Sequence, residues 1–396
     1  MMRSGRRQQH TIVRARLVVL LATAATFSPC SSTPSSRPLK CLLCDIDGSL
    51  VHYEDELRKH GVLSEATTPG GTRLYTSSAR GSGGSAGPAA TSELIALPPS
   101  STGLQAFIST ATLDIAAAIN VPIAIISGGR WTTVQRRVPY LPRAQAVVSD
   151  NGGRIFWRAR EVELSEDGRG GGTDEAAAGD VEAAIVGTMV EDEAWRAGLV
   201  AASGGAIGGM EEDALPPEER SGALWDLYRR LIAEGWACDA KGYTTSFRIK
   251  FGGESAEEQE AEAQRLWRTT APFNLNVANG SGGLGAGGLA ALGLDCSVNL
   301  GAVDVYPAGS GKKAAGLFVA RALGARPEQT AFLCDDDNDV DLATSVGLAV
   351  VPQCTSRSMA EAAAAHGDTV RVAPTGGCFG TEACLRRVLE ATQLAK

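Results

Sequence analysis

The stretch Cys41-Leu-Leu-Cys-Asp45-Ile-Asp47-Gly48-Ser49 decides the fold class of this 396-residue chain. Its first four residues predict a strand that is apolar on both faces, as in a parallel sheet covered by helices on both sides. Residues i and i+2 of a strand point to the same side, so the Asp45 and Asp47 carboxylates project together from its end. Because two carboxylates this close repel each other unless a cation lies between them, the stretch also suggests a metal site.

Five further apolar runs resemble this strand, and helical patterns separate several of them. The alternation predicts an α/β fold, a doubly wound parallel (Rossmann-like) sheet that binds ligands at the carboxyl ends of its strands. The predicted strands are 41–45, 122–127, 144–149, 331–335, 348–352 and 369–373, and the predicted helices include 102–119, 312–323 and 359–366.

Two stretches interrupt this alternation and predict the domain organisation. Residues 66–101 are rich in Gly, Ser, Thr and Pro, which indicates a flexible surface insertion. Residues 153–299 carry acidic amphipathic patterns, notably 216–236 and 255–270, between strand-like runs, and predict an inserted αβ domain. The predicted core is therefore 41–152 together with 300–396.

The first forty residues predict a targeting presequence. Arginines precede a short apolar run at 17–27 and a Ser/Pro-rich segment, which is the order of a signal peptide, while the absence of acids is typical of transit peptides. We therefore expect the protein to enter the secretory pathway or an organelle such as a plastid. The alternative is that the start of the sequence is wrongly assigned and that this segment only resembles a presequence. The run is shorter than the roughly 20 residues of a membrane span, so we expect no membrane association of the mature form.

The net charge restricts the possible partners of the protein, and the positions of the cysteines indicate the state of its thiols. Residues 45–396 contain 30 basic and 45 acidic residues, a net charge of −15, which argues against nucleic acid as the main partner. Most of the nine cysteines lie in apolar runs, so we expect mostly reduced, buried thiols. A disulfide between Cys44 and Cys334 is the minor alternative, on the expectation that both thiols face the same side of neighbouring strands. The oligomeric state stays open.

Three more segments carry side chains suited to anion or metal chemistry. Ser127-Gly128-Gly129 follows the second strand, where a hydroxyl and backbone N–H groups form an anion cradle or a simple helix cap. Lys312 opens a helix, a position where the helix dipole disfavours a cation unless an anion is near. Residues 335–341 place five acids after a strand, which indicates either a solvated loop or a bound cation.

In this order, the four segments resemble the four motifs of the haloacid dehalogenase-like hydrolases. Three features are similar to the branch with large αβ caps, which contains sucrose-phosphate phosphatase and Cof-type sugar phosphatases. They are the Asn338-Asp339 ending of the last motif, Asn151-Gly152 after the third strand, and the insertion at 153–299.

The resemblance implies a Mg²⁺-dependent phosphatase that hydrolyses a small phosphorylated metabolite, a sugar phosphate, through an aspartyl phosphate. It implies that Asp45 is the nucleophile and that Asp47 is the general acid and base. The implied ligands of Mg²⁺ are Asp45, the backbone carbonyl of Asp47, and Asp335, with Asp339 in support; the implied phosphate-binding residues are Ser127, Gly128, Lys312 and Asn338.

Departures from the family pattern leave alternatives open. Asp336 replaces a small residue and is an alternative metal ligand to Asp335, and Lys313 is an alternative to Lys312. A phosphomutase, which passes the phosphoryl group to a second hydroxyl, would share all four motifs. A non-catalytic sugar-phosphate sensor would be expected to lose Asp45 or Asp47.

Overall fold

The computed structural model describes residues 38–77, 90–99, 103–159, 189–251, 289–299 and 302–393. By its internal contacts the chain divides into Met1–Ser36 and Arg37–Lys396, and every described residue belongs to the second unit. The predicted presequence therefore lies outside the described residues except for 38–40. Within the described part of the chain, no helix combines the length and apolar character that crossing a membrane requires.

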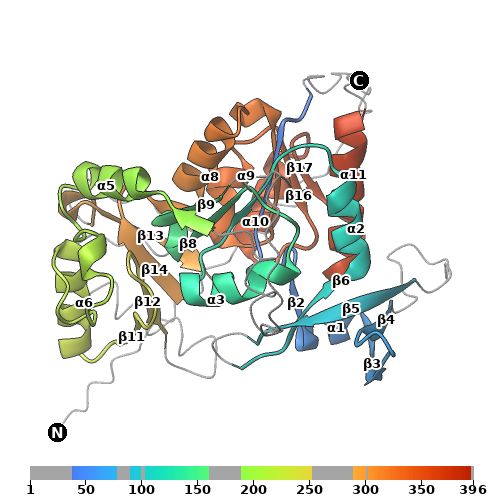
Figure 1. Ribbon diagram of the computed structural model, residues 1–396, viewed down its shortest axis with the longest axis horizontal. Coiled ribbons are helices and arrows are strands. Elements are labelled where there is room, and N and C mark those ends of the chain that lie inside the picture. Colours follow the sequence, from blue (N-terminus) through green and yellow to red (C-terminus); the bar gives the residue numbers. More distant parts are fainter. Residues whose placement is uncertain are drawn as a thin grey trace, which may run out of the picture. The chain divides into compact units, whose positions relative to one another are not determined.

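An eight-stranded sheet forms the centre of the core, and six of its strands run parallel (Figure 1). All four residues of the central strand are buried, because helices cover both sides of the sheet. This arrangement confirms the predicted fold class. The parallel strands, in spatial order, are β8 (Ala146–Ser149), β7 (Ile123–Ile126), β1 (Cys41–Cys44), β15 (Thr330–Leu333), β16 (Leu348–Val351) and β17 (Val370–Val372).

Strand order reverses at β1, since β7 and β8 lie on one side of it and β15 to β17 on the other. Parallel sheets bind ligands at such a switch point. One face of the sheet packs against α2 (Thr110–Ala118), α3 (Trp131–Arg137) and α11 (Gly377–Gln393); the other packs against α8 (Gly311–Ala322), α9 (Val340–Ala343) and α10 (Arg357–Ala365). Short 3₁₀ turns complete the core: η1 (Val138–Tyr140), η2 (Asp150–Gly152), η7 (Pro327–Gln329) and η8 (Asp337–Asp339).

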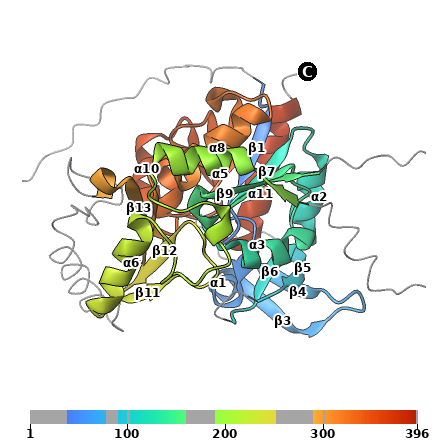
Figure 2. The ribbon, with the colours of Figure 1, turned by 60° about the vertical axis from the view of Figure 1, so that its left-hand side comes forward.

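A second, four-stranded antiparallel sheet with two helices forms what we call the cap (Figure 2). Trp225 and Phe247 are among the buried residues of its separate apolar core. The cap comprises α5 (Glu193–Ala202), η3 (Met210–Glu212), α6 (Ala223–Ala233), β11 (Ala237–Asp239), β12 (Phe247–Lys250), η6 (Leu289–Leu292), β13 (Leu294–Asn299) and β14 (Ala302–Pro307).

The points at which the chain passes between the large sheet and the cap sheet differ from the predicted domain boundaries at 153 and 299. β9 (Arg154–Arg158) and β10 (Met189–Glu191) follow residue 153 but extend the large sheet as antiparallel edge strands. β14 follows residue 299 but pairs with β12 and β13 in the cap. The predicted helix 255–270 lies outside the described residues, and the predicted helix 216–236 is the shorter α6.

A third sheet corrects the prediction of a flexible insertion at 66–101. In the described part of that range, strands alternate between buried and exposed residues, and Tyr75 and Leu94 pack with Leu57 in a small apolar core. The predicted helix 102–119 also begins later, because residues 106–109 pair as a strand. The sheet contains β2 (His52–Tyr53), β6 (Ala106–Ser109), β5 (Thr91–Leu97), β4 (Arg73–Ser77) and β3 (Gly61–Thr67), with α1 (Glu54–His60) between β2 and β3.

All eight cysteines in the described residues are free, as expected for reduced thiols. The register of β1 and β15 pairs Cys44 with Leu333, not with Cys334. Cys44 therefore packs in the apolar cluster on one face of the sheet and Cys334 in the cluster on the other. The expectation that both thiols face the same side is wrong, because it placed the two strands one residue out of register.

Candidate active site

Three buried carboxylates meet at the carboxyl ends of β1 and β15. One oxygen from each of Asp45, Asp335 and Asp339 lies within 4.8 Å of the other two. Asp45 is 5% exposed and its backbone N–H donates to Leu333 O at 2.9 Å, which continues the β1–β15 ladder to Asp45. The parallel pairing of two apolar strands therefore places two motifs that are far apart in the sequence side by side.

Lys312, at the start of α8, provides a buried cation for this cluster. Its Nζ lies 2.9 Å from Asp45 Oδ1 and 2.8 Å from Asp339 Oδ1, and its side chain is 3% exposed. Burial alone would lower the pKa of Lys312, but the Asp339 and Asp45 carboxylates outweigh it and raise the pKa above its ordinary value. Lys312 is therefore charged, and it pairs with two of the three carboxylates.

Burial and this excess of negative charge raise the pKa values of two of the carboxyl groups. Burial raises the pKa of Asp45 to about 8, although the Lys312 ammonium acts in the opposite direction. Burial, and then the Asp45 and Asp339 carboxylates, raise the pKa of Asp335 well above its usual range. A buried carboxylate cluster takes up protons or a cation to balance its charge.

Hydrogen bonds fix two of the three carboxylates. Asp335 accepts from the Ser49 hydroxyl at 2.8 Å and from the Thr355 hydroxyl at 3.0 Å. Asp339 Oδ2 accepts from the backbone N–H groups of Asp335 and Asp336 at 3.3 Å each, while its Oδ1 faces Lys312. Both Asp339 oxygens are thus in use.

These residues fit a hard divalent cation. The donor set is all oxygen, as Mg²⁺ prefers, and the cluster carries more negative charge than Lys312 balances. Asp45 and Asp335 are the carboxylates that would hold the ion, and the backbone of Asp47 lies in the same turn. Asp335 and Asp336 were the two predicted alternatives for the metal ligand. Asp335 lies within the carboxylate cluster, whereas Asp336 lines the neighbouring pocket.

Gly48 is required where the turn after β1 passes Asp335. Its φ is +80°, and a Cβ at this position would lie 2.0 Å from Asp335 Oδ2. We expect Gly48→Ala to displace the Asp335 carboxylate and weaken Mg²⁺ binding about 10- to 100-fold, the usual cost of disturbing the support of a metal ligand. Isothermal titration with Mg²⁺ measures this change.

Gly71 is the matched control for this substitution. It has the same φ of +80°, but a Cβ there would meet no atom within 4 Å. Both alanine variants carry the backbone strain of about 1 kcal/mol, whereas only Gly48→Ala crowds the carboxylate. Equal Mg²⁺ affinity in the two variants would show that Gly48 serves only the turn.

A pocket of about 310 Å³ adjoins the acidic cluster. Ser127 is 3% exposed and its Oγ accepts from the Gly129 N–H at 3.0 Å, so the loop after β7 is held in a tight turn. Asn338 has a buried Oδ1 for which the described residues provide no partner. The pocket brings together six of the predicted site residues: Asp45, Asp47, Ser127, Gly128, Lys312 and Asn338.

The close approach of the motif loops leaves room only for glycine at 128. A Cβ on Gly128 would lie 2.7 Å from Asn151 Oδ1 and 3.3 Å from Asn338 Nδ2. The second and fourth motifs therefore meet across this glycine. Lys313 is exposed and does not line this pocket, whereas Lys312 does.

Residues that the sequence analysis missed complete the pocket. Arg137, from the end of α3, and Tyr53, from β2, both contact Asp47 and line the pocket with it. Ser49 and Tyr53 follow Asp47 closely and could have been considered as neighbours of the motif. Arg137 lies 90 residues from Asp47, and no local pattern marks it.

The cap supplies the remaining wall. Arg248 on β12 makes a bidentate ion pair with the fully buried Asp304, at 2.7 and 2.8 Å, and Asn299 donates to the same carboxylate at 2.9 Å. On the core side, Arg130 pairs with Asp239 of the cap at 3.1 Å. The pocket is thus lined by polar side chains that are already held in place.

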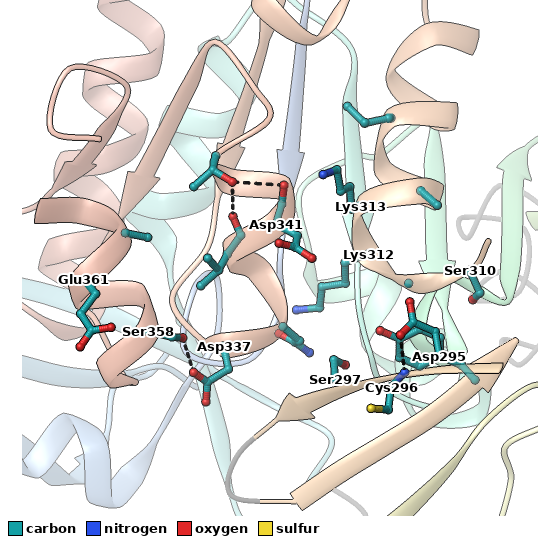
Figure 3. Close-up of a pocket in the computed structure, with 18 of the residues that line it drawn as sticks. Asp295, Cys296, Ser297, Ser310, Lys312, Lys313, Asp337, Asp341, Ser358 and Glu361 are labelled. Atoms are coloured by element: carbon teal, nitrogen blue, oxygen red, sulfur yellow. Dashed lines mark hydrogen bonds between the residues drawn. The ribbon is translucent and has the colours of Figure 1, made fainter. Parts of the chain in front are cut away.

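A larger pocket, of about 580 Å³, lies next to the first and shares Lys312 and Asn338 with it. In Figure 3, Asp337 and Glu361 lie on one side of this pocket, and Lys312 and Asp295 on the other. Ser358 donates a hydrogen bond to Asp337 there. Asp45, Ser127 and Lys312, three of the predicted site residues, line the smaller pocket, so the smaller pocket is the candidate active site.

Comparison with known proteins gives similarities of structure only. No protein-family model matches the sequence, and a search of curated proteins finds no match. Similar solved structures include the sucrose-phosphatase of Synechocystis sp. PCC6803, with 11% identity, a TM-score of 0.47, and coverage of 90% of this chain and 98% of that one. They also include the haloacid dehalogenase-like hydrolase yhjK of Bacillus subtilis, with 9% identity, a TM-score of 0.41, and coverage of 89% and 92%.

A third similar structure is the subclass IIB sugar phosphatase BT4131, with 12% identity, a TM-score of 0.42, and coverage of 90% of this chain and 99% of that one. These proteins are haloacid dehalogenase-like hydrolases, the superfamily that the four sequence motifs resemble. At these identities and TM-scores the similarities say nothing about the reaction of this chain, which has to be argued from its site.

Proposed function

We propose that this chain is a haloacid dehalogenase-like phosphatase that uses Mg²⁺ to hydrolyse a small phosphorylated metabolite of the sugar-phosphate class. One observation carries the proposal: the buried Asp45 carboxylate, the buried Lys312, the acidic cluster and the Ser127 loop meet at one pocket. Phosphoryl transfer depends on positioning and charge stabilisation, and this set of groups provides both.

In the first step, Asp45 attacks phosphorus through a carboxylate oxygen. The bond between phosphorus and the ester oxygen breaks, and Asp47 gives its proton to the leaving oxygen, which departs as an alcohol. Lys312, Ser127 and the backbone N–H groups near Gly128 would hold the phosphoryl oxygens. Bound Mg²⁺ supplies positive charge that reduces the repulsion between the nucleophile and the phosphoryl group.

In the second step, water hydrolyses the aspartyl phosphate. Asp47, now a carboxylate, takes a proton from the water as its oxygen attacks phosphorus, and Asp45 is released with inorganic phosphate. Each step therefore uses Asp47 in a different protonation state, and the enzyme returns to its starting form.

The size and polarity of the pocket support a sugar phosphate as the substrate class. A volume of about 310 Å³ is near the lower end of small-molecule sites. Other side chains that line the pocket, including Asn299, Arg248 and Thr133, are hydrogen-bonding groups suited to hydroxyls. The small cavity favours a monosaccharide phosphate over a nucleotide or a phosphoprotein.

The test is a panel of phosphorylated metabolites incubated with Mg²⁺, with release of inorganic phosphate as the measurement. Hydrolysis of a subset of sugar phosphates that stops when EDTA is added supports the proposal. Formation of an isomeric sugar phosphate without free phosphate would indicate a phosphomutase instead. Binding of sugar phosphates without any turnover would indicate a sensor.

Mg²⁺ binding is expected to strengthen as the pH rises. The pKa of Asp45 is raised to about 8 and that of Asp335 is also raised, so the metal-free site holds protons near neutral pH that the cation must displace. Calorimetric titration at pH 6.5 and 8.5 should give the higher affinity at pH 8.5. At the lower pH, proton release should appear as a dependence of the binding enthalpy on the buffer. Equal affinity without proton release would contradict this expectation.

A further inference from the structure

Two side chains enclose one oxygen of the predicted acid and base, Asp47. Arg137 Nη1 donates to Asp47 Oδ1 at 2.6 Å, and the Tyr53 hydroxyl donates to the same oxygen at 2.7 Å. Arg137 Nη2 also donates to the Tyr53 hydroxyl oxygen at 3.3 Å. The three groups form a closed triangle, so the rotamer of Asp47 is set by two residues from separate elements.

The burial of the partners makes this triangle rigid. The Arg137 side chain is 2% exposed, whereas Asp47 is 36% exposed. The guanidinium also lies 5.8 Å from the centre of the Tyr53 ring, within the range of a cation–π contact. A buried guanidinium is costly unless it is paired, and within the described part of the chain its recorded carboxylate partner is Asp47.

Tyr53 acts as a donor in this arrangement. Burial and the nearby Asp47 carboxylate raise the pKa of Tyr53 above its ordinary value, so its hydroxyl keeps its proton. Both donors point at Oδ1. No described residue donates a recorded hydrogen bond to Asp47 Oδ2, and the triangle lines the same pocket as Asp45.

We propose that Arg137 and Tyr53 are positioning residues that hold Asp47 by Oδ1 and leave Oδ2 to exchange the proton with the leaving oxygen and then with water. The proposal rests on the phosphatase function proposed above. It predicts that substituting Arg137 or Tyr53 slows only those steps of the reaction that need proton transfer. A sugar alkoxide must be protonated as it leaves, whereas p-nitrophenolate leaves without help.

The test compares the rate of the first step, measured in a single turnover as release of the alcohol, for a sugar phosphate from the panel and for p-nitrophenyl phosphate, using Arg137→Gln and Tyr53→Phe. We expect this rate for the sugar phosphate to fall about 10- to 100-fold, part of the 10²- to 10⁴-fold that general acid catalysis supplies. We expect the burst of p-nitrophenolate to keep its rate within about threefold, because that leaving group needs no acid. Steady-state kcat should fall for both substrates, because hydrolysis of the aspartyl phosphate uses Asp47 as the base.

Three further variants serve as comparisons for this result. Arg137→Lys keeps the charge and should recover part of the lost kcat. Arg136→Gln alters the exposed arginine next in the sequence and should behave as wild type. Asp47→Asn should reproduce, in stronger form, the selective loss in the first step on the sugar phosphate, and should lower kcat for both substrates. Tyr53→Phe removes one oxygen and keeps the ring, so it tests the proposal even if Arg137→Gln does not fold.

The outcomes separate this proposal from the proposed function. If wild type and Asp47→Asn differ as expected but Arg137→Gln and Tyr53→Phe slow the first step equally for both substrates, or not at all, the positioning role is wrong and the phosphatase stands. If wild type with Mg²⁺ hydrolyses neither substrate, the proposed function fails and this inference fails with it.

Discussion

Asp45→Asn is expected to lower turnover of the best panel substrate by at least about 10³-fold, the order of effect for removing a covalent nucleophile. The amide oxygen is a poor nucleophile, and the nitrogen cannot form the acyl phosphate. Initial rates of phosphate release with saturating Mg²⁺ measure the effect. In wild type, brief incubation and acid quenching should trap a phosphorylated protein that the variant lacks.

Folding does not explain this loss. Asparagine matches aspartate in shape, and Lys312 keeps its ion pair with Asp339, so the substitution leaves no buried charge without a partner. We expect the variant to fold, with a circular dichroism spectrum like that of wild type. Asp55→Asn, at an exposed position in α1, is the control and should keep full activity. Substantial turnover by Asp45→Asn would remove the basis of the proposed mechanism.

Lys312→Met is expected to have the second largest effect, on both activity and stability. It removes the ammonium group that lies 2.9 Å from Asp45 and 2.8 Å from Asp339. Breaking a buried ion pair on one side costs about 3–5 kcal/mol, because the remaining charge is left without a partner. Loss of a preorganised positive group at a reacting phosphate costs a further factor of about 10²–10³ in kcat.

Lys313→Met is the matched control, since Lys313 is the next residue on α8 and is exposed. It should match wild type in thermal midpoint and in kcat. Lys312→Met should show a lower midpoint, and its remaining activity is measured below that temperature. Equal impairment of the two variants would mean that the start of α8, and not the Lys312 charge, is what the site requires.

The sequence predicted those parts of the molecule that follow from local patterns. The six parallel strands are continuous apolar runs, because both faces of each are covered, and their carboxyl ends carry the polar residues that meet at β1. Asp45, Ser127, Lys312 and Asn338 could be expected to converge because each directly follows such a strand or begins a helix. Parallel strands align those positions at one edge.

Features that depend on distant pairing were not predicted. The Gly- and Ser-rich composition of 66–101 concealed β4 and β5, whose alternation of buried and exposed residues becomes meaningful only once they pair with β3 and β6. β14 was assigned to the core by its place after 299, although it pairs with β12. Arg137 reaches Asp47 across 90 residues, and a charged residue in the last turn of a helix is usually solvent-exposed.

The walls of the smaller pocket come from three different sheets. Asp45 follows β1 of the large sheet, Arg248 and Asn299 stand on cap strands, and Tyr53 ends β2 of the third sheet. Under the proposed function, Asp45 and Tyr53 would serve bond breaking, and the cap strands would contact the rest of the substrate. Replacing cap residues would then alter which metabolite is accepted while the groups around Asp45 stay unchanged.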